Sequence, residues 1–191
     1  ESITTTSLSL KPKSNNNSNL KFEFEGETNK AFEDKTRAFF KKIDKYFPFI
    51  LNHDIEIKSK NNFPHSSGIA SSASSMAALS ACLVDFEKMN NSEMSDDFFY
   101  KKASFISRIG SGSASRSICG PVVIWGESQA YENSNDLYAV NISNQTHEIF
   151  KDFNDTILII DPGQKKISST EGHKLMNKNP FSNQRYDIAR K

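Results

Sequence analysis

Apolar and polar residues alternate along the first part of the chain, and this pattern predicts strands. Leucines alternate with polar residues between Ser2 and Lys11, and apolar residues alternate with charged ones from Leu20 to Glu25. A polar, asparagine-rich stretch from Lys13 to Asn19 separates the two. A period of two places every second side chain on one face of a sheet. The sequence therefore predicts two strands that pair as a hairpin.

Helical spacing replaces the alternation farther along the chain. Aromatic residues and isoleucine recur at helical intervals from Asn29 to Tyr46, which predicts a helix with a buried aromatic face. Alternating isoleucines predict a strand from Asp54 to Ser59. A helix of small residues, apolar on more than one side and therefore mostly buried, is predicted from Ile69 to Met89. The serine and aspartates at 95–97 are typical of a helix cap, and the helix that follows is expected to end near Arg108.

The sequence of the C-terminal part of the chain predicts both strands and helices. They are strands at Val122–Trp125, Leu137–Ile142 and Thr156–Ile160, a short helix at Ser113–Cys119 and a helix from about Glu171. The run Thr156–Ile160 is apolar throughout, as in a buried strand. Composition changes near residues 151–154, so we expect one domain at 1–152 and the beginning of a second domain at 153–191.

Composition and charge limit the classes of partner. The 191 residues are enough for one large domain or for one domain and part of another, and the chain is expected to be an internal piece of a longer protein. With 24 basic and 23 acidic residues, the net charge of +1 favours neither nucleic acid nor a membrane as partner. The sequence shows no signal peptide and no apolar run of membrane length. Two isolated cysteines, Cys82 and Cys119, do not suit a metal cluster and fit a reducing, cytoplasmic setting.

The segment from Asn61 to Ser75 is the part of the chain best suited to chemistry. Pro64 forbids a helix just before it, and the small residues after Gly68 can begin a helix with little bulk at its start. The first N–H groups of a helix have no internal partner and lie at the positive end of its dipole, so an anion binds well there. Ser71 and Ser72 would add hydroxyl donors. A capped helix packed close to a sheet is the alternative interpretation of the same residues.

A second segment, from Arg108 to Ser117, again places glycines and hydroxyls together and adds a guanidinium. Arginine offers a planar fork of donors that fits carboxylate or phosphate oxygens, and serine hydroxyls and backbone N–H groups complete such a site. Neither segment is a Walker A sequence, since no Gly-Lys-Ser/Thr follows the glycines. Two such loops suggest a nucleotide and a second phosphorylated molecule that meet face to face.

These segments resemble a known family. Pro64-x-x-x-Gly68-Ile69-x-Ser71-Ser72-Ala73 is similar to the phosphate-loop motif of the GHMP kinase superfamily, with Ile69 in place of the usual leucine. Asn-Asn-Phe-Pro before it, Gly-Ser-Gly-Ser-Ala-Ser-Arg-Ser at 110–117 and Lys-Lys-Ile-Ser-Ser-Thr-Glu-Gly at 165–172 together resemble the diphosphomevalonate decarboxylase family. The first motif specifies only the superfamily, and the two later runs are much more specific. The resemblance covers essentially the whole chain.

The resemblance implies a fold and a set of site residues. The fold is expected to be α+β: a GHMP-kinase-like N-terminal domain, of the ribosomal protein S5 domain 2-like type and without its first strands, and then the start of a ferredoxin-like C-terminal domain. ATP would lie against residues that match the phosphate loop, namely Gly68, Ala70, Ser71 and Ser72, with Ser59 on the nucleotide side. The second substrate would contact Ser111, Gly112, Ser113, Arg116 and Ser169.

The resemblance also implies a reaction. The 3-hydroxyl of mevalonate 5-diphosphate would be phosphorylated by ATP, and loss of phosphate and carbon dioxide would then give isopentenyl diphosphate. Mg²⁺ would bridge nucleotide oxygens, and Arg116 would be the catalytic residue that holds the substrate carboxylate. The family's early lysine motif and the aspartate that acts on the hydroxyl are not found in this chain, and Asp161 precedes a Pro-Gly turn rather than replacing that aspartate. The chain alone is therefore expected not to turn over; the family analogy allows a homodimer.

Two other hypotheses remain open from the sequence. One is another GHMP enzyme, such as a mevalonate or phosphomevalonate kinase or a monophosphate decarboxylase. The other is a non-catalytic nucleotide-binding homologue that kept the loops and lost the aspartate. His65, where the family commonly has threonine, is expected to be a solvated loop residue, with a phosphate contact as the alternative.

Overall fold

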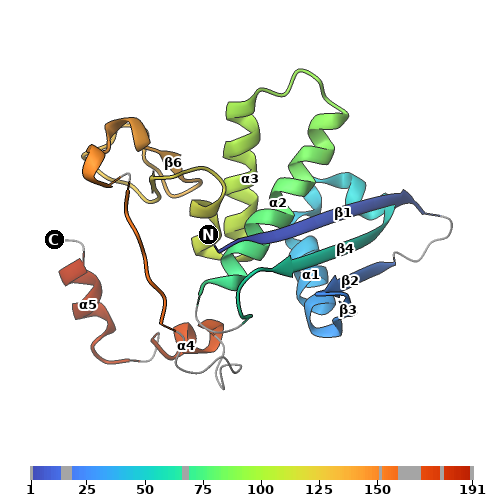
Figure 1. The fold of residues 1–191 in the computed structure, drawn as a ribbon, viewed down its shortest axis with the longest axis horizontal. Coiled ribbons are helices and arrows are strands. Elements are labelled where there is room, and N and C mark those ends of the chain that lie inside the picture. The colour runs from blue at the N-terminus through green and yellow to red at the C-terminus, as the bar shows by residue number, and fades with distance from the viewer. Residues whose placement is uncertain are drawn as a thin grey trace.

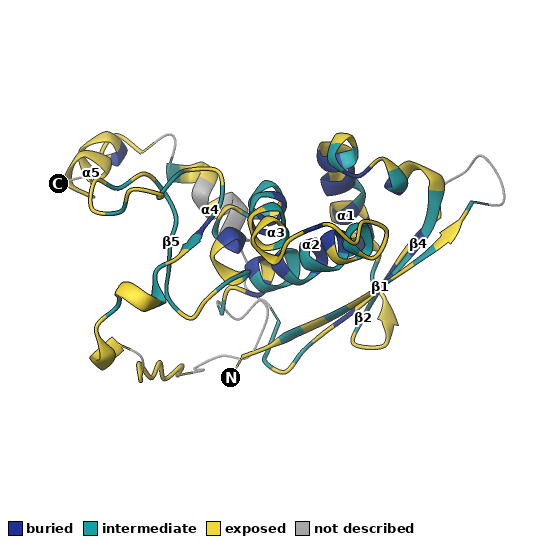
Figure 2. Ribbon diagram, turned by 90° about the horizontal axis from the view of Figure 1, so that it is seen from above, coloured by how far each residue is buried: buried dark blue, intermediate teal, exposed yellow. Residues whose placement is uncertain are grey.

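The computed structural model describes residues 2–13, 19–65, 69–150, 152–158, 169–176 and 179–189. A four-stranded sheet carries helices on one of its faces (Figure 1, Figure 2). The strands of this sheet are β1 (Thr4–Pro12), β2 (Leu20–Phe24), β3 (Glu27–Thr28) and β4 (His53–Asn61). Their order across the sheet is β1-β4-β2-β3.

The last of these strands in sequence, β4, lies between β1 and β2. It pairs antiparallel with β1 and parallel with β2, so β1 and β2 are not neighbours and the predicted hairpin is wrong. Burial gives the physical reason. Ile55 and Ile57 of β4 are 5% and 0% exposed, whereas the leucines of β1 are only half-buried. The strand with the most buried side chains takes the central place, and alternation along one strand carries no information about its neighbour.

The two faces of the sheet differ in character. Leu8 of β1 and Phe22 of β2 are both in register with Ile57, and these apolar side chains face the helices. The alternate positions of β4 hold charged residues, among them the exposed Lys58 and Lys60. The sheet therefore has one apolar face that forms the core and one polar face toward solvent.

Three helices cover the apolar face, and all three match predicted helices. They are α1 (Lys30–Ile43), α2 (Ser71–Met89) and α3 (Asp96–Gly110). The Asn29 side chain caps α1 by accepting a hydrogen bond from the Phe32 N–H at 3.0 Å, and Ser95 caps α3 in the same way. The core between helices and sheet includes the fully buried side chains Ile43, Phe47, Leu83 and Ile106.

Shorter elements connect and follow these helices. 3₁₀ helices occupy Asp44–Tyr46, Pro48–Asn52, Gly112–Ser117 (η3), Ser143–Gln145 and Glu148–Phe150. The strands β5 (Val123–Ile124) and β6 (Val140–Asn141) pair antiparallel, so two predicted strands are confirmed in position, although each is only two residues long. The helices α4 (Ser169–Met176) and α5 (Ser182–Ala189) complete the described chain.

The predicted buried strand at Thr156–Ile160 is wrong over the residues that the structure describes. Residues 156–158 form no strand and are exposed, Leu158 to 83%. An apolar run is buried only where a second surface covers it, and no described element pairs with this segment. The mixed α/β architecture is confirmed, whereas the ferredoxin-like second domain and the boundary at 152–153 stay predictions. No helix in the described ranges is long and apolar enough to cross a membrane.

Candidate functional site at the start of α2

The strand–loop–helix arrangement expected for anion binding is present where β4 leads toward α2. Ala70 precedes the helix in a left-handed conformation, with φ of 51° and ψ of 31°. Its carbonyl oxygen accepts hydrogen bonds from the N–H groups of Ala73 at 2.9 Å and Ser74 at 3.2 Å. The helix therefore begins at Ser71 rather than at the predicted Ile69. Gly68, a predicted ATP contact, lies outside the described residues.

The two predicted serines at the helix start face different ways. Ser71 is 9% exposed, and its carbonyl oxygen accepts hydrogen bonds from the hydroxyls of Ser74 and Ser75 at 3.1 Å and 2.8 Å. Ser72 is exposed and lines a small cavity beside the helix. Of these two side chains, the hydroxyl of Ser72 is the one that a ligand at the helix start can approach.

The hydroxyl group of Ser59 links β4 to β1. It is 6% exposed at the end of β4, and its Oγ lies 3.0 Å from Oγ1 of Thr6 on β1. A second link joins the sheet to the helix, because the Thr4 hydroxyl lies 2.7 Å from the Ser74 hydroxyl and donates to Asn61 Oδ1. These polar contacts hold the first turns of α2 against the ends of β1 and β4.

The cavity beside Ser72 has a volume of about 90 Å³ and lies between the sheet, α1 and α2. Its wall is mostly apolar and includes Phe24 of β2, Phe32 of α1 and Met76 of α2. Ser59, Ser72 and Ser75 add hydroxyls, and the exposed Lys35 of α1 adds a cation. The nucleotide-side serine and the phosphate-loop serine of the prediction thus line one cavity.

His65 is the residue at which the sequence prediction fails. Its ring is half-buried, with its centroid 5.1 Å from that of Phe24 and 5.0 Å from that of Phe32, so it is not a solvated loop residue. Burial lowers the pKa of His65 below its usual range, Lys35 adds to that effect, and Glu25 opposes it. The sequence shows no sign of this cluster, because its three rings come from three separate segments.

The second predicted loop begins at the end of α3, where this helix packs against α2. A Cβ added to Gly110 would lie 2.5 Å from Met76 Sδ and 3.1 Å from a ring carbon of Phe39. A side chain at this position would require Met76 and Phe39 to move. Met76 also lines the cavity beside Ser72, so the two predicted loops meet at the N-terminal half of α2.

The predicted substrate contacts lie along the surface of η3, which packs against α2 and α3. Gly112 and Arg116 are exposed, and Ser111 and Ser113 are half-buried. Arg116 forms no ion pair with any residue in the described part of the chain, so its guanidinium is available to an anion. The sixth residue of the run, Ser115, has a structural role, since it is buried and its carbonyl oxygen accepts a hydrogen bond from Ser104 at 2.8 Å.

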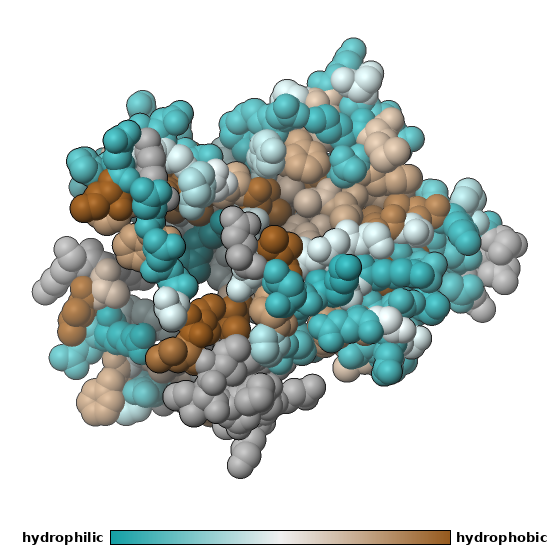
Figure 3. Space-filling model, in the orientation of Figure 1, coloured by the Kyte–Doolittle hydropathy of each residue, from teal (hydrophilic) through white to brown (hydrophobic). Residues whose placement is uncertain are grey.

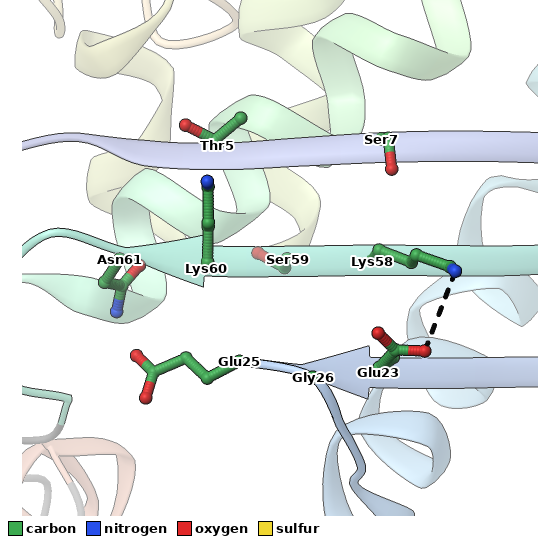
Figure 4. Close-up of a pocket in the computed structure, with 9 residues that line it drawn as sticks. All are labelled: Thr5, Ser7, Glu23, Glu25, Gly26, Lys58, Ser59, Lys60 and Asn61. Carbon is green, nitrogen blue, oxygen red and sulfur yellow. Dashed lines mark ion pairs between the residues drawn. The ribbon is translucent and has the colours of Figure 1, made fainter.

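The remaining predicted contact, Ser169, is the first residue of α4, and its side chain lies outside what the structure describes. A larger hollow of about 450 Å³ lies elsewhere, over the polar face of the sheet (Figure 4). Four of its nine lining residues are charged, including Lys58 and Glu23, whose charged groups lie 3.8 Å apart. Of the predicted site residues that the structure describes, only Ser59 borders this hollow.

Comparison with known proteins identifies the family of this chain. The family model described as "Diphosphomevalonate decarboxylase-like N-terminal domain" matches residues 1–138. A diphosphomevalonate decarboxylase of Ganoderma lucidum is 38% identical over 143 residues, which are 75% of this chain and 31% of that protein. The chain therefore spans about a third of that relative's length.

Solved structures give the same relationship. The mevalonate diphosphate decarboxylase of Staphylococcus aureus superposes with a TM-score of 0.67 at 26% identity, over 96% of this chain and 55% of that one. The corresponding enzyme of Enterococcus faecalis, described for ATP binding mediated by mevalonate diphosphate, superposes with a TM-score of 0.55 at 26% identity, over 74% and 40%. Sequence motifs, fold and family match agree, and the chain belongs to the family of diphosphomevalonate decarboxylase-like N-terminal domains.

Proposed function

We propose that the complete protein is a diphosphomevalonate decarboxylase, a carboxy-lyase that uses ATP and Mg²⁺ to convert mevalonate 5-diphosphate to isopentenyl diphosphate. The observation that carries the proposal is that both loops predicted to bind anions adjoin α2: Ser71 and Ser72 begin this helix, and Gly110 at the end of α3 packs against its Met76. Transfer of a phosphoryl group requires such a meeting of donor and acceptor. The proposal places the reaction in isoprenoid biosynthesis and in the cytoplasm, and allows a homodimer.

The nucleotide side of the proposed site fits a polyphosphate. The start of α2 directs its first N–H groups away from the helix, at the positive end of a 19-residue helix dipole. Ala70 and Ser71 contribute backbone, and Ser72 contributes an exposed hydroxyl. The cavity that Ser59 and Ser72 share lies directly beside this helix start. We propose that the phosphates of ATP bind at the helix start.

The substrate side of the proposed site is the surface of η3. We propose that Ser111, Gly112 and Ser113 bind the diphosphate of the substrate and that Arg116 binds its carboxylate. An exposed arginine that has no ion pair with the described residues keeps both donor edges of its fork for a carboxylate. Binding of the carboxylate there would orient the group that is lost as carbon dioxide. Ser169 is proposed to face the mevalonyl part.

Magnesium, when bound with the nucleotide, would neutralise charge in the transfer step. No described residue of this chain is assigned to the ion. Removal of divalent ions with a chelator is expected to abolish turnover of the complete protein.

The proposed reaction is tested by its products. The complete protein, ATP, Mg²⁺ and carboxyl-labelled mevalonate 5-diphosphate should release labelled carbon dioxide and ADP in equal amounts. ADP without carbon dioxide would instead indicate a kinase of the same superfamily. If ATP binds but neither product forms, the protein is a non-catalytic nucleotide-binding homologue and the proposal is wrong.

The proposed role of Arg116 has its own test. Arg116→Ala should lower turnover by about 100-fold, the cost of removing one partner of a charge-assisted pair, without lowering the melting temperature, because the side chain is exposed. Arg116→Lys keeps the charge but loses the planar fork, so it should recover activity only in part. Arg185→Ala, at another exposed arginine, is the matched control. Unchanged kinetics of Arg116→Ala would remove this residue from the site.

A further inference from the structure

Three aromatic rings from separate segments meet beside the start of α2. Phe24 ends β2, Phe32 lies in the first turn of α1, and His65 lies in the segment that follows β4. The ring centroids of Phe24 and Phe32 are 5.2 Å apart, and each is about 5 Å from that of His65. Interplanar angles of 60° and 65° place the imidazole edge-on to both phenyl rings. The His65 ring is thereby packed against β2 and α1.

This packing leaves a polar atom unsatisfied. Within the part of the chain that the structure describes, Nδ1 of His65 is buried without a hydrogen-bond partner, and so is Nδ2 of Asn61, four residues earlier. Burial of an unpaired polar group costs on the order of 1 to 3 kcal/mol, so a phenyl ring at position 65 would pack with less penalty. The histidine thus introduces a polar, titratable ring where an apolar one would be more stable.

The cluster borders the proposed nucleotide site. His65, Phe24 and Phe32 share the wall of one cavity with Ser72, Ser75 and Met76 of α2. Because protein interiors are close-packed and pass strain from one side chain to the next, a displacement of the imidazole is expected to shift the part of this wall that α2 forms.

We propose that His65 is a positioning residue for the proposed nucleotide site: its ring, packed against Phe24 and Phe32, holds the start of α2 in the conformation that binds the phosphates of ATP. The inference rests on the proposed function for the identity of the ligand. It does not require a contact between His65 and the nucleotide.

The packing has a direct consequence for pH. Lys35 of α1 disfavours a positive charge on His65, Glu25 after β2 favours it, and β4 and α2 contribute only the hydroxyls of Ser59, Ser72 and Ser75 to the shared cavity. The pKa of the packed imidazole is therefore lowered, mainly by burial. A released imidazole has an ordinary pKa of about 6.5 and takes up a proton more readily. The packed form is thus stable above about pH 6.5 and is progressively lost as the pH falls below it.

Three substitutions in the complete protein separate the parts of the inference. His65→Phe keeps a ring between Phe24 and Phe32 and removes the titration. His65→Ala removes both the ring and the charge. His53→Phe is the matched control, because His53 also lies beside two phenyl rings, those of Phe49 and Phe86, but at the opposite end of β4.

Two measurements are made between pH 5.5 and pH 7.5. The first is the dissociation constant for ATP with Mg²⁺, and the second is amide hydrogen exchange over residues 71–75 without any ligand. At pH 7.5, His65→Ala should bind ATP about 10-fold more weakly, since two aromatic contacts are lost. At pH 5.5, the unaltered protein should bind up to about 10-fold more weakly relative to His65→Phe, because one pH unit changes the protonation ratio tenfold. At pH 5.5, the backbone amides of residues 71–75 should also exchange faster in the unaltered protein than in His65→Phe.

The two measurements distinguish the inference from the proposed function. If ATP binds but the unaltered protein, His65→Phe and His53→Phe share one pH dependence in both measurements, the inference is overturned and the proposed function stands. If ATP does not bind while exchange at 71–75 still depends on pH only when His65 is present, the nucleotide assignment fails and the positioning role holds. Tighter ATP binding by the unaltered protein at low pH, relative to His65→Phe, would also overturn the inference.

Discussion

At the scale of single residues, the start of α2 depends on one unusual backbone conformation. Ala70 has a left-handed backbone, which costs an L-residue about 1 to 2 kcal/mol relative to its ordinary conformations. The two hydrogen bonds that its carbonyl oxygen accepts hold it there. With Ala70 in this conformation, α2 begins at Ser71.

Replacement of Ala70 by glycine is expected to stabilise the protein. Glycine adopts the left-handed region without the Cβ penalty, and the gain should exceed the entropy that glycine adds to the unfolded chain, for a net increase of about 0.5 to 1 kcal/mol in the free energy of unfolding. The measurement is urea unfolding of the complete protein. Ala78→Gly, within α2, is the matched control and should destabilise by about 1 kcal/mol. A destabilising Ala70→Gly would show that Ala70 is not strained.

Residue-level chemistry was partly predictable. The serine cap of α3 could be predicted because capping involves neighbours a few residues apart, and Ser95 indeed accepts from the Phe98 N–H. The environment of His65 could not, because its burial depends on Phe24 and Phe32, which are distant in the sequence. Sequence patterns predict contacts between residues a few positions apart. They do not reveal the partners of a side chain that packs against distant segments of the chain.

At the scale of elements, the packing of α3 against α2 decides how the two loops are placed. The contact of Gly110 with Met76 and Phe39 brings three helices together at one point. The sequence motif contains two glycines, and the resemblance assigns a substrate contact to Gly112 and no role to Gly110. The structure separates them, because a Cβ on Gly112 would meet only a ring carbon of Trp125 at an ordinary 3.6 Å.

The two glycines should therefore respond differently to alanine. Gly110→Ala forces Met76 and Phe39 to move and should lower the free energy of unfolding by about 1 to 3 kcal/mol. Gly112→Ala should change it by less than about 0.5 kcal/mol and should instead raise KM for the diphosphate substrate. Thermal unfolding and steady-state kinetics of the complete protein measure the two effects.

A double substitution tests whether close packing against Met76 causes the expected loss of stability in Gly110→Ala. Met76→Ala removes the side chain that the new methyl group would meet, so the cost of Gly110→Ala should shrink in that background. If the two substitutions are simply additive, close packing against Met76 is not the reason for the glycine. Equal stability losses for Gly110→Ala and Gly112→Ala would contradict the assignment of separate roles.

At the scale of the whole molecule, the apolar surface is unevenly distributed. Large apolar side chains that are more than 60% exposed occur mainly after residue 148, namely Ile149, Phe153, Leu158, Leu175, Phe181 and Ile188. Figure 3 shows strongly hydrophobic surface on the side of the molecule that carries β6, α4 and α5. The compact core of α1–α3 on the sheet does not extend to these segments. Apolar surface of this extent normally marks a contact with another part of a protein or with a partner.

Limited proteolysis is expected to reveal this difference. In a protein consisting only of residues 1–191, chymotrypsin should cut soon after Phe153 and Leu158, which lie in exposed, irregular backbone. Phe98 is 52% exposed but lies within α3, so it should resist and serves as the control. In the complete protein, Phe153 and Leu158 should be protected by the residues that cover them. Equal cleavage in both forms would show that the segment stays open.

The sequence by itself determined the helices α1, α2 and α3, the strand before the phosphate loop, the cap of α3 and the two polar loops, because these depend on periodicity and on neighbours a few residues apart. Only the tertiary structure decided that β4 is central, that Gly110 packs on Met76, and that His65 is buried against two phenyl rings. The physical reason is burial. Which residues lose contact with water depends on elements that are remote along the chain, and no local pattern records which elements those are.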